Sequence, residues 1–226
     1  MLASRRIFPD TAAEAALRVT CPALPTSGMD NRILLILDLD ETLIHATATK
    51  LGDDFAFQLY HYYVYKRPSL DTFLATCAER FQLAVWSSAS DDYVAEVVKR
   101  IFPEGTNLAF VWGRSRCTPV STARADELGY YNTDYSSHYE YAKLLKKVKR
   151  LGFNLNSVLI VDDTPAKVRN CYGNAIYPTP FLGNPDDIEL AMLAEYLDSI
   201  KEVENTRSIE KRQWQLKYTP RKIEDQ

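Results

Sequence analysis

Five consecutive apolar residues, Ile33 to Leu37, run directly into Asp38, and Asp40 follows one residue later. Because these apolar residues do not alternate with polar ones, the pattern predicts a strand buried on both faces, as in the middle of a parallel sheet. Ligands bind beyond the carboxyl ends of such strands. Side chains repeat with a period of two along a strand, so both carboxylates point to the same side. The stretch therefore predicts a site where one carboxylate attacks and the other handles a proton.

Two simpler interpretations of the Asp38-x-Asp40 pattern are a solvated surface turn and the start of a calcium-binding loop. The calcium loop fails on its spacing. Counting from Asp38 puts Leu43 where an EF-hand requires glycine, and Thr49 where it requires a glutamate that binds through both oxygens. For this motif taken alone, the surface turn stays open.

Strand and helix patterns alternate along the rest of the chain. Further strands are predicted at 81–86, 108–112 and 158–161, and helices at 68–80, 91–101, 139–151 and 186–203, with another helix opening at Pro165. This alternation predicts an α/β fold in which a parallel sheet with right-handed crossovers is flanked by helices. The polar residues that follow the strands then share one edge of the sheet.

Three segments depart from this alternation. Residues 55–65 are rich in aromatic side chains and predict a β-hairpin flap. Residues 113–138 are polar, contain Pro119 and Gly129, and predict an irregular insertion beside the site. Residues 1–30 predict a separable N-terminal extension with a short helix. We therefore expect residues 31–226 to form one domain without a large cap.

Composition limits the class of protein and its partners. Of the 226 residues 46% are hydrophobic and 25% charged, which is typical of a soluble globular protein. No apolar run approaches the ~20 residues of a membrane helix, and the N-terminus lacks the apolar region of a secretory signal. We expect a cytoplasmic or otherwise intracellular protein, nuclear if the source is a eukaryote, with no membrane partner. A net charge of −3 gives no general attraction to nucleic acid, and the four cysteines form no C-x-x-C pair.

The stretch Asp38-Leu39-Asp40-Glu41-Thr42-Leu43 resembles the D-x-D-x-T-L signature of the haloacid dehalogenase (HAD) superfamily, and specifically its branch of NLI-interacting-factor and RNA polymerase C-terminal-domain phosphatases. Four further segments are similar to motifs of this branch and come in the same order. They are Val64–Pro68 with Phe73–Leu74, Val85–Ala89, Tyr141–Lys143 with Leu151–Gly152, and Val158–Pro165. The ordered set is much more specific than any one member, and it spans roughly residues 31–214.

The resemblance implies a phosphatase that works through an aspartyl-phosphate. Asp38 would be the nucleophile and Asp40 the general acid and base, while Thr42 would tighten the turn that orients both. The resemblance also implies Mg²⁺, with ligands from Asp38, from the backbone carbonyl of Asp40, and from the pair Asp162-Asp163. Small phosphatases of the branch carry Asp-Asn at this pair, so the division of ligand roles between the two aspartates stays open.

The remaining candidates would bind the phosphoryl group or the substrate. Ser87 is the candidate donor to a phosphate oxygen, and Ser88 beside it is nearly as good. Lys143 would balance the phosphoryl charge. Arg114 resembles an arginine of the family, and contact with substrate and pinning of the insertion are equal alternatives for it. Thr42, Ser88 and Arg114 are thus the candidate substrate-binding residues.

The leading expectation is a Mg²⁺-dependent phosphatase that acts on phosphoserine or phosphothreonine in a protein or peptide, because a site without a large cap is open to bulky substrates. A phosphatase for small molecules or nucleic-acid ends is the second alternative. A non-catalytic binding module of the same fold is the third, and the presence of both Asp38 and Asp40 argues against it.

Overall fold

The computed structural model describes residues 31–121 and 139–218 of the 226-residue chain. The predicted N-terminal extension lies outside the described residues, and so does most of the predicted insertion. Among the described helices, none is long and apolar enough to cross a membrane.

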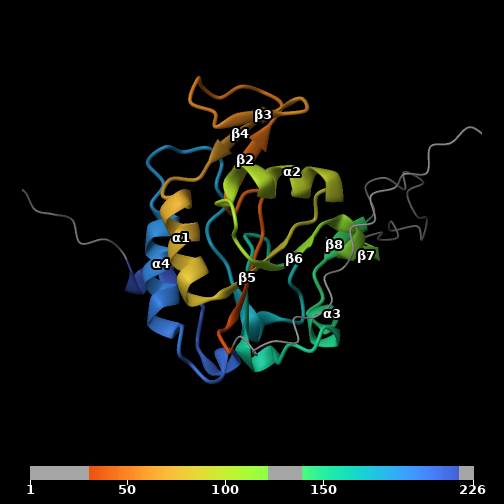
Figure 1. Cartoon of the computed structure of the whole chain (residues 1–226), viewed down its shortest axis with the longest axis vertical. Coiled ribbons are helices and arrows are strands. Elements are labelled where there is room, and N and C mark those ends of the chain that lie inside the picture. The colour runs from red at the N-terminus through yellow and green to blue at the C-terminus, as the bar shows by residue number, and fades with distance from the viewer. Residues whose placement is uncertain (1–30, 122–138, 219–226) are drawn as a thin grey trace, which may run out of the picture. The chain divides into compact units, whose positions relative to one another are not determined.

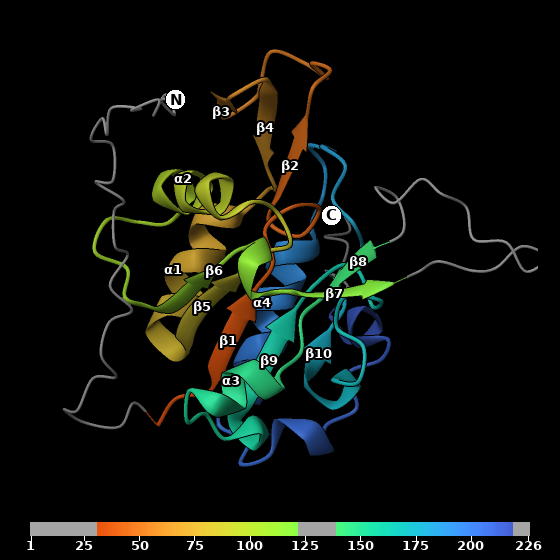
Figure 2. The same cartoon turned by 90° about the vertical axis from the view of Figure 1, so that its right-hand side faces the viewer.

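A five-stranded parallel sheet forms the centre of the described domain, in the order β10-β9-β1-β5-β6 (Figures 1 and 2). Its strands are β1 (Leu34–Leu37), β5 (Gln82–Trp86), β6 (Leu108–Trp112), β9 (Val158–Val161) and β10 (Ala175–Ile176). β1 is the middle strand, and all four of its residues are buried, as the unbroken apolar run predicts. It pairs in register with both neighbours, so that Leu37, Val85 and Val161 end side by side. The chain segments that follow these three residues therefore leave the sheet at one edge.

Helices cover both faces of this sheet. They are α1 (Leu70–Arg80), α2 (Asp91–Ile101), α3 (Lys146–Arg150) and α4 (Glu189–Ile200). Leu35 and Leu37 of β1 belong to one hydrophobic cluster, with apolar residues of α1, α2 and α4, whereas Leu34 and Ile36 belong to a second cluster with Val148 of α3. The period of two along β1 thus divides its side chains between two cores. The result is the predicted α/β fold.

Two small antiparallel additions accompany the sheet. The first has the order β2-β4-β3, with β2 (Ile44–Thr47), β3 (Phe57–Leu59) and β4 (Tyr62–Lys66), and is drawn in orange at the top of Figure 1. Its β3–β4 hairpin confirms the predicted flap, while β2 was not predicted. The second addition pairs β7 (Thr118–Ser121) with β8 (Tyr139–Ala142). Within the described ranges neither addition amounts to a large cap.

The helix predicted at 139–151 is wrong in its first half. Residues 139–142 form β8, and the helix α3 covers only Lys146–Arg150. Leu145 and Val148 are buried, which explains the helical periodicity of the apolar residues. The partner of β8 is β7, about 20 residues earlier, and no local pattern reveals a pairing at that distance. The predicted insertion is likewise regular at its start, where a 3₁₀ turn (Arg114–Arg116) precedes β7.

The helix predicted to open at Pro165 is also wrong. Residues 165–170 form successive turns, in which the amide of Lys167 donates to the carbonyl of Thr164 (3.0 Å) and that of Val168 to Pro165 (3.2 Å). These bonds span three residues, where an α-helix would span four. The other elements predicted within the described residues are observed, with α1 beginning two residues later than expected and α4 three residues shorter at each end.

Candidate functional site

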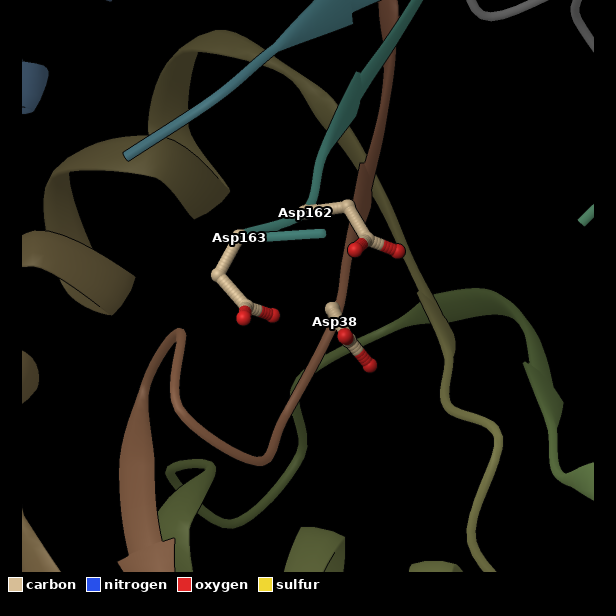
Figure 3. Close-up of side chains that lie close together, drawn as sticks. All are labelled: Asp38, Asp162 and Asp163. Carbon is tan, nitrogen blue, oxygen red and sulfur yellow. The ribbon is translucent and has the colours of Figure 1, made fainter. Parts of the chain in front are cut away.

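Three carboxylates meet at the carboxyl end of the central strands (Figure 3). Asp38 follows β1, and Asp162 and Asp163 follow the neighbouring strand β9. One carboxylate oxygen from each lies within 4.8 Å of the other two. The backbone continues its sheet bonding into this cluster, because the amide of Asp38 donates to the carbonyl of Val161 at 3.0 Å. The in-register pairing of β1 with β9 therefore fixes where the three acids stand.

Asp38 is the least satisfied group of this cluster. Its side chain is 1% exposed, yet neither carboxylate oxygen accepts a hydrogen bond from a neutral group among the described residues. Two ammonium groups lie at ion-pair distance instead: Nζ of Lys143 is 2.8 Å from Oδ1, and Nζ of Lys167 is 3.7 Å from Oδ2. A buried carboxylate without hydrogen bonds is costly to the fold. Such a group is a candidate for a role in chemistry or ligand binding.

Lys143 is completely buried between two of the acids. Its ammonium group also donates to Oδ2 of Asp162 at 2.6 Å. Burial alone would lower the pKa of Lys143, but the attraction of Asp162 and Asp38 outweighs it and holds the pKa above its ordinary value. Burial raises the pKa of Asp162 to about 6, against the opposing effect of Lys143. Lys143 is thus a protonated, buried cation in contact with Asp38 and Asp162.

The donor set fits a hard divalent cation. Carboxylate oxygens are the ligands that Mg²⁺ and Ca²⁺ prefer, and like charges about 4 Å apart repel by about 4 kcal/mol at an effective dielectric of about 20. Both oxygens of Asp162 are already engaged, one by Lys143 and the other by the amide of Thr164 at 2.9 Å. Both oxygens of Asp163 are engaged as well, by the hydroxyls of Thr42 (3.4 Å) and Thr164 (2.9 Å), so Asp38, Asp162 and Asp163 are candidate metal ligands as a group.

The carboxylate of Asp40 has partners of its own, apart from the three-acid cluster. The hydroxyl of Tyr93, in α2, donates to Oδ1 at 2.7 Å, and Ser87 Oγ lies 3.4 Å from Oδ2. Burial raises the pKa of Asp40, and the hydrogen bond from Tyr93 partly offsets this. A carboxyl group with a raised pKa can hold a proton nearer to neutral pH and release it to a reacting atom.

Thr42 connects the two acidic segments. Its hydroxyl accepts from the amide of Asp163 at 3.2 Å and donates to Oδ1 of the same residue at 3.4 Å. Glu41, just before it, adopts a positive φ of 59°, and its carbonyl accepts from the amide of Phe181 at 2.7 Å. Burial raises the pKa of Glu41 to about 7, with nearby Asp40 adding to the effect. Thr42 was expected to orient its own turn, and it also reaches across to the segment after β9.

Arg67 also contacts the turn that contains Thr42. It is buried, donates to the carbonyl of Thr42 at 3.0 Å and binds both oxygens of Asp187, at 2.8 and 2.9 Å. A two-pronged arginine–carboxylate pair restricts geometry more than a single contact does. Arg67 lies in a segment that resembles a family motif, but no role was predicted for it. In the structure its hydrogen bonds hold the loop from Asp38 to Thr42 in place.

The remaining predicted residues lie at the end of β5. Ser87 is buried, and its Oγ accepts from the amide of Ala89 at 3.0 Å. The carbonyl of Ser88 accepts from Nε of Arg114 at 2.9 Å, and the guanidinium group of Arg114 lies over the ring of Tyr141, 5.1 Å from its centre. Among the described contacts Arg114 joins the end of β5 to the β7–β8 hairpin, which supports the pinning alternative, while contact with substrate stays a prediction.

Two residues near the acids were missed in the sequence. Tyr93 lies on the buried side of α2, where its spacing from Val94 and Val97 gives only a core signal. Lys167 follows the acidic segment by four residues, and its Nζ lies 4.0 Å from Oδ1 of Asp163. A lysine four residues after an aspartate is an ordinary helical ion pair in a sequence pattern, so nothing distinguished it.

A model of the family described as NLI interacting factor-like phosphatase matches residues 33–207. The chain is 29% identical over 182 residues to the "Probable C-terminal domain small phosphatase" of Dictyostelium discoideum, covering 77% of this chain and 53% of that protein. It is 24% identical over 187 residues to "Nuclear envelope morphology protein 1" of Schizosaccharomyces pombe, and the match covers 79% of this chain and 35% of that protein. It is 28% identical over 193 residues to the "CTD nuclear envelope phosphatase 1 homolog" of Drosophila melanogaster, and the match covers 79% of this chain and 71% of that protein.

Among solved structures, the chain is similar to Fcp1, titled an essential RNA polymerase II CTD phosphatase. The sequence identity is 21%, the TM-score is 0.46, and the match covers 76% of this chain and 51% of that one. The chain thus spans about half the length of several proteins that it matches.

Proposed function

The chain belongs to the family of NLI interacting factor-like phosphatases, and on that premise we propose that it hydrolyses phosphoserine or phosphothreonine in proteins. One observation carries the chemistry: the buried Asp38 accepts no hydrogen bond from a neutral group among the described residues, lies between two ammonium groups and faces two further carboxylates. A structural carboxylate would be hydrogen-bonded. A nucleophile needs at least one free oxygen, and Asp38 has it.

In the first step an oxygen of Asp38 attacks the phosphorus atom. The new bond from this oxygen to phosphorus forms as the bond from phosphorus to the serine or threonine oxygen breaks. Asp40 gives its proton to that leaving oxygen, which departs as the neutral alcohol. Tyr93 holds the Asp40 carboxyl in place for this transfer. Covalent catalysis divides one slow displacement into two easier ones, which matters because phosphate monoesters are among the slowest substrates to react unaided.

In the second step Asp40 takes a proton from water, and the resulting hydroxyl attacks phosphorus and frees Asp38. The proton given in the first step is thereby recovered. Lys143 holds one positive charge beside Asp38 throughout. Asp38, Asp162 and Asp163 would hold Mg²⁺, which would supply positive charge to neutralise the phosphoryl group. Ser87 stands near Asp40 and would orient a phosphate oxygen.

A protein substrate is supported by two features. Relatives are named as C-terminal-domain and nuclear envelope phosphatases, and the described residues contain no large cap that would enclose a small substrate. The names of the relatives also agree with an intracellular, nucleus-associated place of action, which we propose for this chain. Neither membrane nor nucleic acid is required by the chemistry of the site.

A substrate panel tests this function. The purified full chain is assayed for phosphate release from phosphoserine and phosphothreonine peptides, nucleotides, sugar phosphates and 5′-phosphorylated oligonucleotides, with Mg²⁺ and with a chelator. We expect peptides to give the highest kcat/KM and the chelator to abolish release. A preference for nucleotides or sugar phosphates would assign the small-molecule alternative. No release from any member, or from a generic aryl phosphate, would overturn the enzymatic assignment and leave the binding module.

A further inference from the structure

Lys167 is a second basic residue beside the predicted nucleophile, and no motif assigned a role to it. Its Nζ lies 3.7 Å from Oδ2 of Asp38 and 4.0 Å from Oδ1 of Asp163. Lys143 approaches the opposite oxygen of Asp38. The nucleophile therefore has an ammonium group on each side, and Lys167 stands on the side of the predicted metal ligands.

The two lysines are held differently. Lys143 is completely buried and lies 2.6 to 2.8 Å from two carboxylates, so its charge is committed to them. The side chain of Lys167 is 24% exposed, and its distances are those of ion pairs longer than hydrogen bonds. Lys167 thus reaches the acids from the solvent side without being fixed to either. Its ammonium group is free to turn toward a ligand that arrives from solvent.

The base of the Lys167 side chain is nevertheless well placed. Its carbonyl accepts from the amide of Lys143 at 2.7 Å, and its amide donates to the carbonyl of Thr164 at 3.0 Å. The backbone therefore holds both lysines beside the acidic cluster, whatever side chain stands at position 167. A substitution there changes the charge at the site and leaves the backbone bonds in place.

The charge balance of the site calls for such a cation. When ionised, the carboxylates of Asp38, Asp40, Asp162 and Asp163 outnumber the ammonium groups of Lys143 and Lys167 two to one. A phosphate monoester brings up to two more negative charges into this space. Lys143 already contacts two acids. A second cation on the solvent side of the site would therefore reduce the repulsion between the carboxylates and the phosphate.

We propose that Lys167 is a phosphate-binding residue that changes partners. Without a ligand its ammonium group balances Asp38 and Asp163. When a phosphorylated side chain enters, the ammonium group turns to the phosphoryl oxygens, and the acids that it leaves would be available to hold a divalent cation. This inference deepens the proposed function, since it names a further substrate contact of the same site.

Binding measurements test the proposal apart from turnover. Calorimetric titrations of Mg²⁺ alone, and of inorganic phosphate with Mg²⁺ present, are made on the wild type and on Lys167→Met, Lys167→Arg and Lys149→Met. Lys149 is an exposed lysine of α3 and serves as the matched control. For Lys167→Met we expect phosphate affinity to fall about 10-fold and Mg²⁺ affinity to rise about 3-fold, since a competing charge is gone. Lys167→Arg stays within about 3-fold of wild type, and Lys149→Met is unchanged.

Two results would overturn this role. Phosphate affinity in Lys167→Met equal to that of Lys149→Met would show that Lys167 does not contact phosphate. Weaker Mg²⁺ binding in Lys167→Met would show that Lys167 supports the metal site and does not compete for it. A folding defect would appear in the far-ultraviolet circular dichroism of Lys167→Met, and Lys167→Gln then replaces it. Lys167-dependent phosphate binding in a protein that hydrolyses nothing would defeat the proposed function and leave the phosphate contact standing.

Discussion

Each end of the central sheet carries an aspartate between two basic side chains. At the carboxyl end Asp38 lies between Lys143 and Lys167. Beyond the amino end Asp198 lies between Arg80 (2.5 Å) and Lys201 (2.9 Å), beside a hollow lined by Asn31, Arg32, Arg80, Lys201 and Glu202. Asp198 is 40% exposed and accepts a hydrogen bond, and this bond from Lys201 lowers its pKa. Asp38 is buried, and among the described residues only ammonium groups approach its oxygens.

One aspartate and two basic side chains are present at both ends, so the kinds of residue alone do not distinguish a candidate reactive carboxylate from a surface one. The same one acid and two cations form a solvated ion pair at Asp198, where water and salt screen the charges. At Asp38 the charges are withdrawn from water, so each charge affects the others more strongly. Burial therefore distinguishes the two aspartates, and paired substitutions at the two ends can test that distinction.

The largest expected difference is in turnover. Asp38→Asn removes the proposed nucleophile, and we expect kcat/KM for an aryl phosphate to fall at least about 10⁴-fold, as for other covalent nucleophiles. Asp198→Asn makes the same chemical change at the exposed end, and we expect turnover within about 2-fold of wild type. A fall of less than about 10-fold in Asp38→Asn would contradict the assignment of the nucleophile.

The next difference is in folding stability. Lys143→Met removes the cation between two buried acids, and we expect a loss of about 3–5 kcal/mol in the free energy of unfolding, because the carboxylates are left buried and uncompensated. Lys201→Met at the exposed end should leave the urea midpoint nearly unchanged. Equal midpoints for the two variants would show that burial does not separate the two charge clusters.

How far the sequence predicts this arrangement depends on the range of the interactions. The apolar runs Ile33–Leu37 and Val158–Val161 were enough to predict β1 and β9 as buried strands of one parallel sheet, and the family resemblance brought Asp38 together with Asp162 and Asp163; the order of the strands was not predicted. The helix 91–101 was predicted with its observed bounds, since both its periodicity and its first residues are local signals.

Interactions between distant segments were not predictable. β8 depends on β7, across the segment between them, and Lys167 reaches Asp38 because successive turns fold the chain back after β9. Tyr93 lies in the amphipathic helix α2 and contacts Asp40, which is 53 residues earlier in the chain. The acids, Lys143 and Thr42 were identified in the sequence, whereas the contacts of Tyr93 and Lys167 with the acids were visible only in the structure.

A smaller effect is expected from Tyr93→Phe. Loss of the hydroxyl frees the Asp40 carboxyl, so a phosphoserine peptide, whose leaving oxygen needs a proton, should be hydrolysed about 10-fold more slowly. A nitrophenyl phosphate, whose leaving group needs little protonation, should change less than about 2-fold. Tyr196→Phe removes a buried hydroxyl of α4 and serves as control. Equal slowing of both substrates would mean that Tyr93 supports only the structure.

The smallest effect concerns pH and Mg²⁺. Burial raises the pKa of Asp162 to about 6 and of Glu41 to about 7. These values exceed the unfolded ones, near 4, so their stabilising contribution is complete below about pH 4 and is lost as the pH rises through 6 and 7. Metal ions bind the ionised acids.

We therefore expect the rise in Tm produced by Mg²⁺ to increase by about 2–4 °C between about pH 5 and about pH 8, as one additional kcal/mol would give. Thermal unfolding at fixed Mg²⁺ concentration measures this directly. The variant Asp163→Asn should reduce the increase, whereas Asp198→Asn should keep it. A shift of equal size at both pH values would contradict proton–metal competition at the cluster.

Chemical trapping of the intermediate tests the central claim that Asp38 itself becomes phosphorylated. The protein is mixed with a phosphorylated peptide, quenched in acid during turnover and treated with borohydride, which reduces an acyl phosphate to an alcohol. Mass spectrometry of the digest should then find homoserine at position 38 and unmodified aspartate at positions 40, 162 and 163. Homoserine at another of these positions, or at none of them while phosphate is being released, would contradict the role assigned to Asp38.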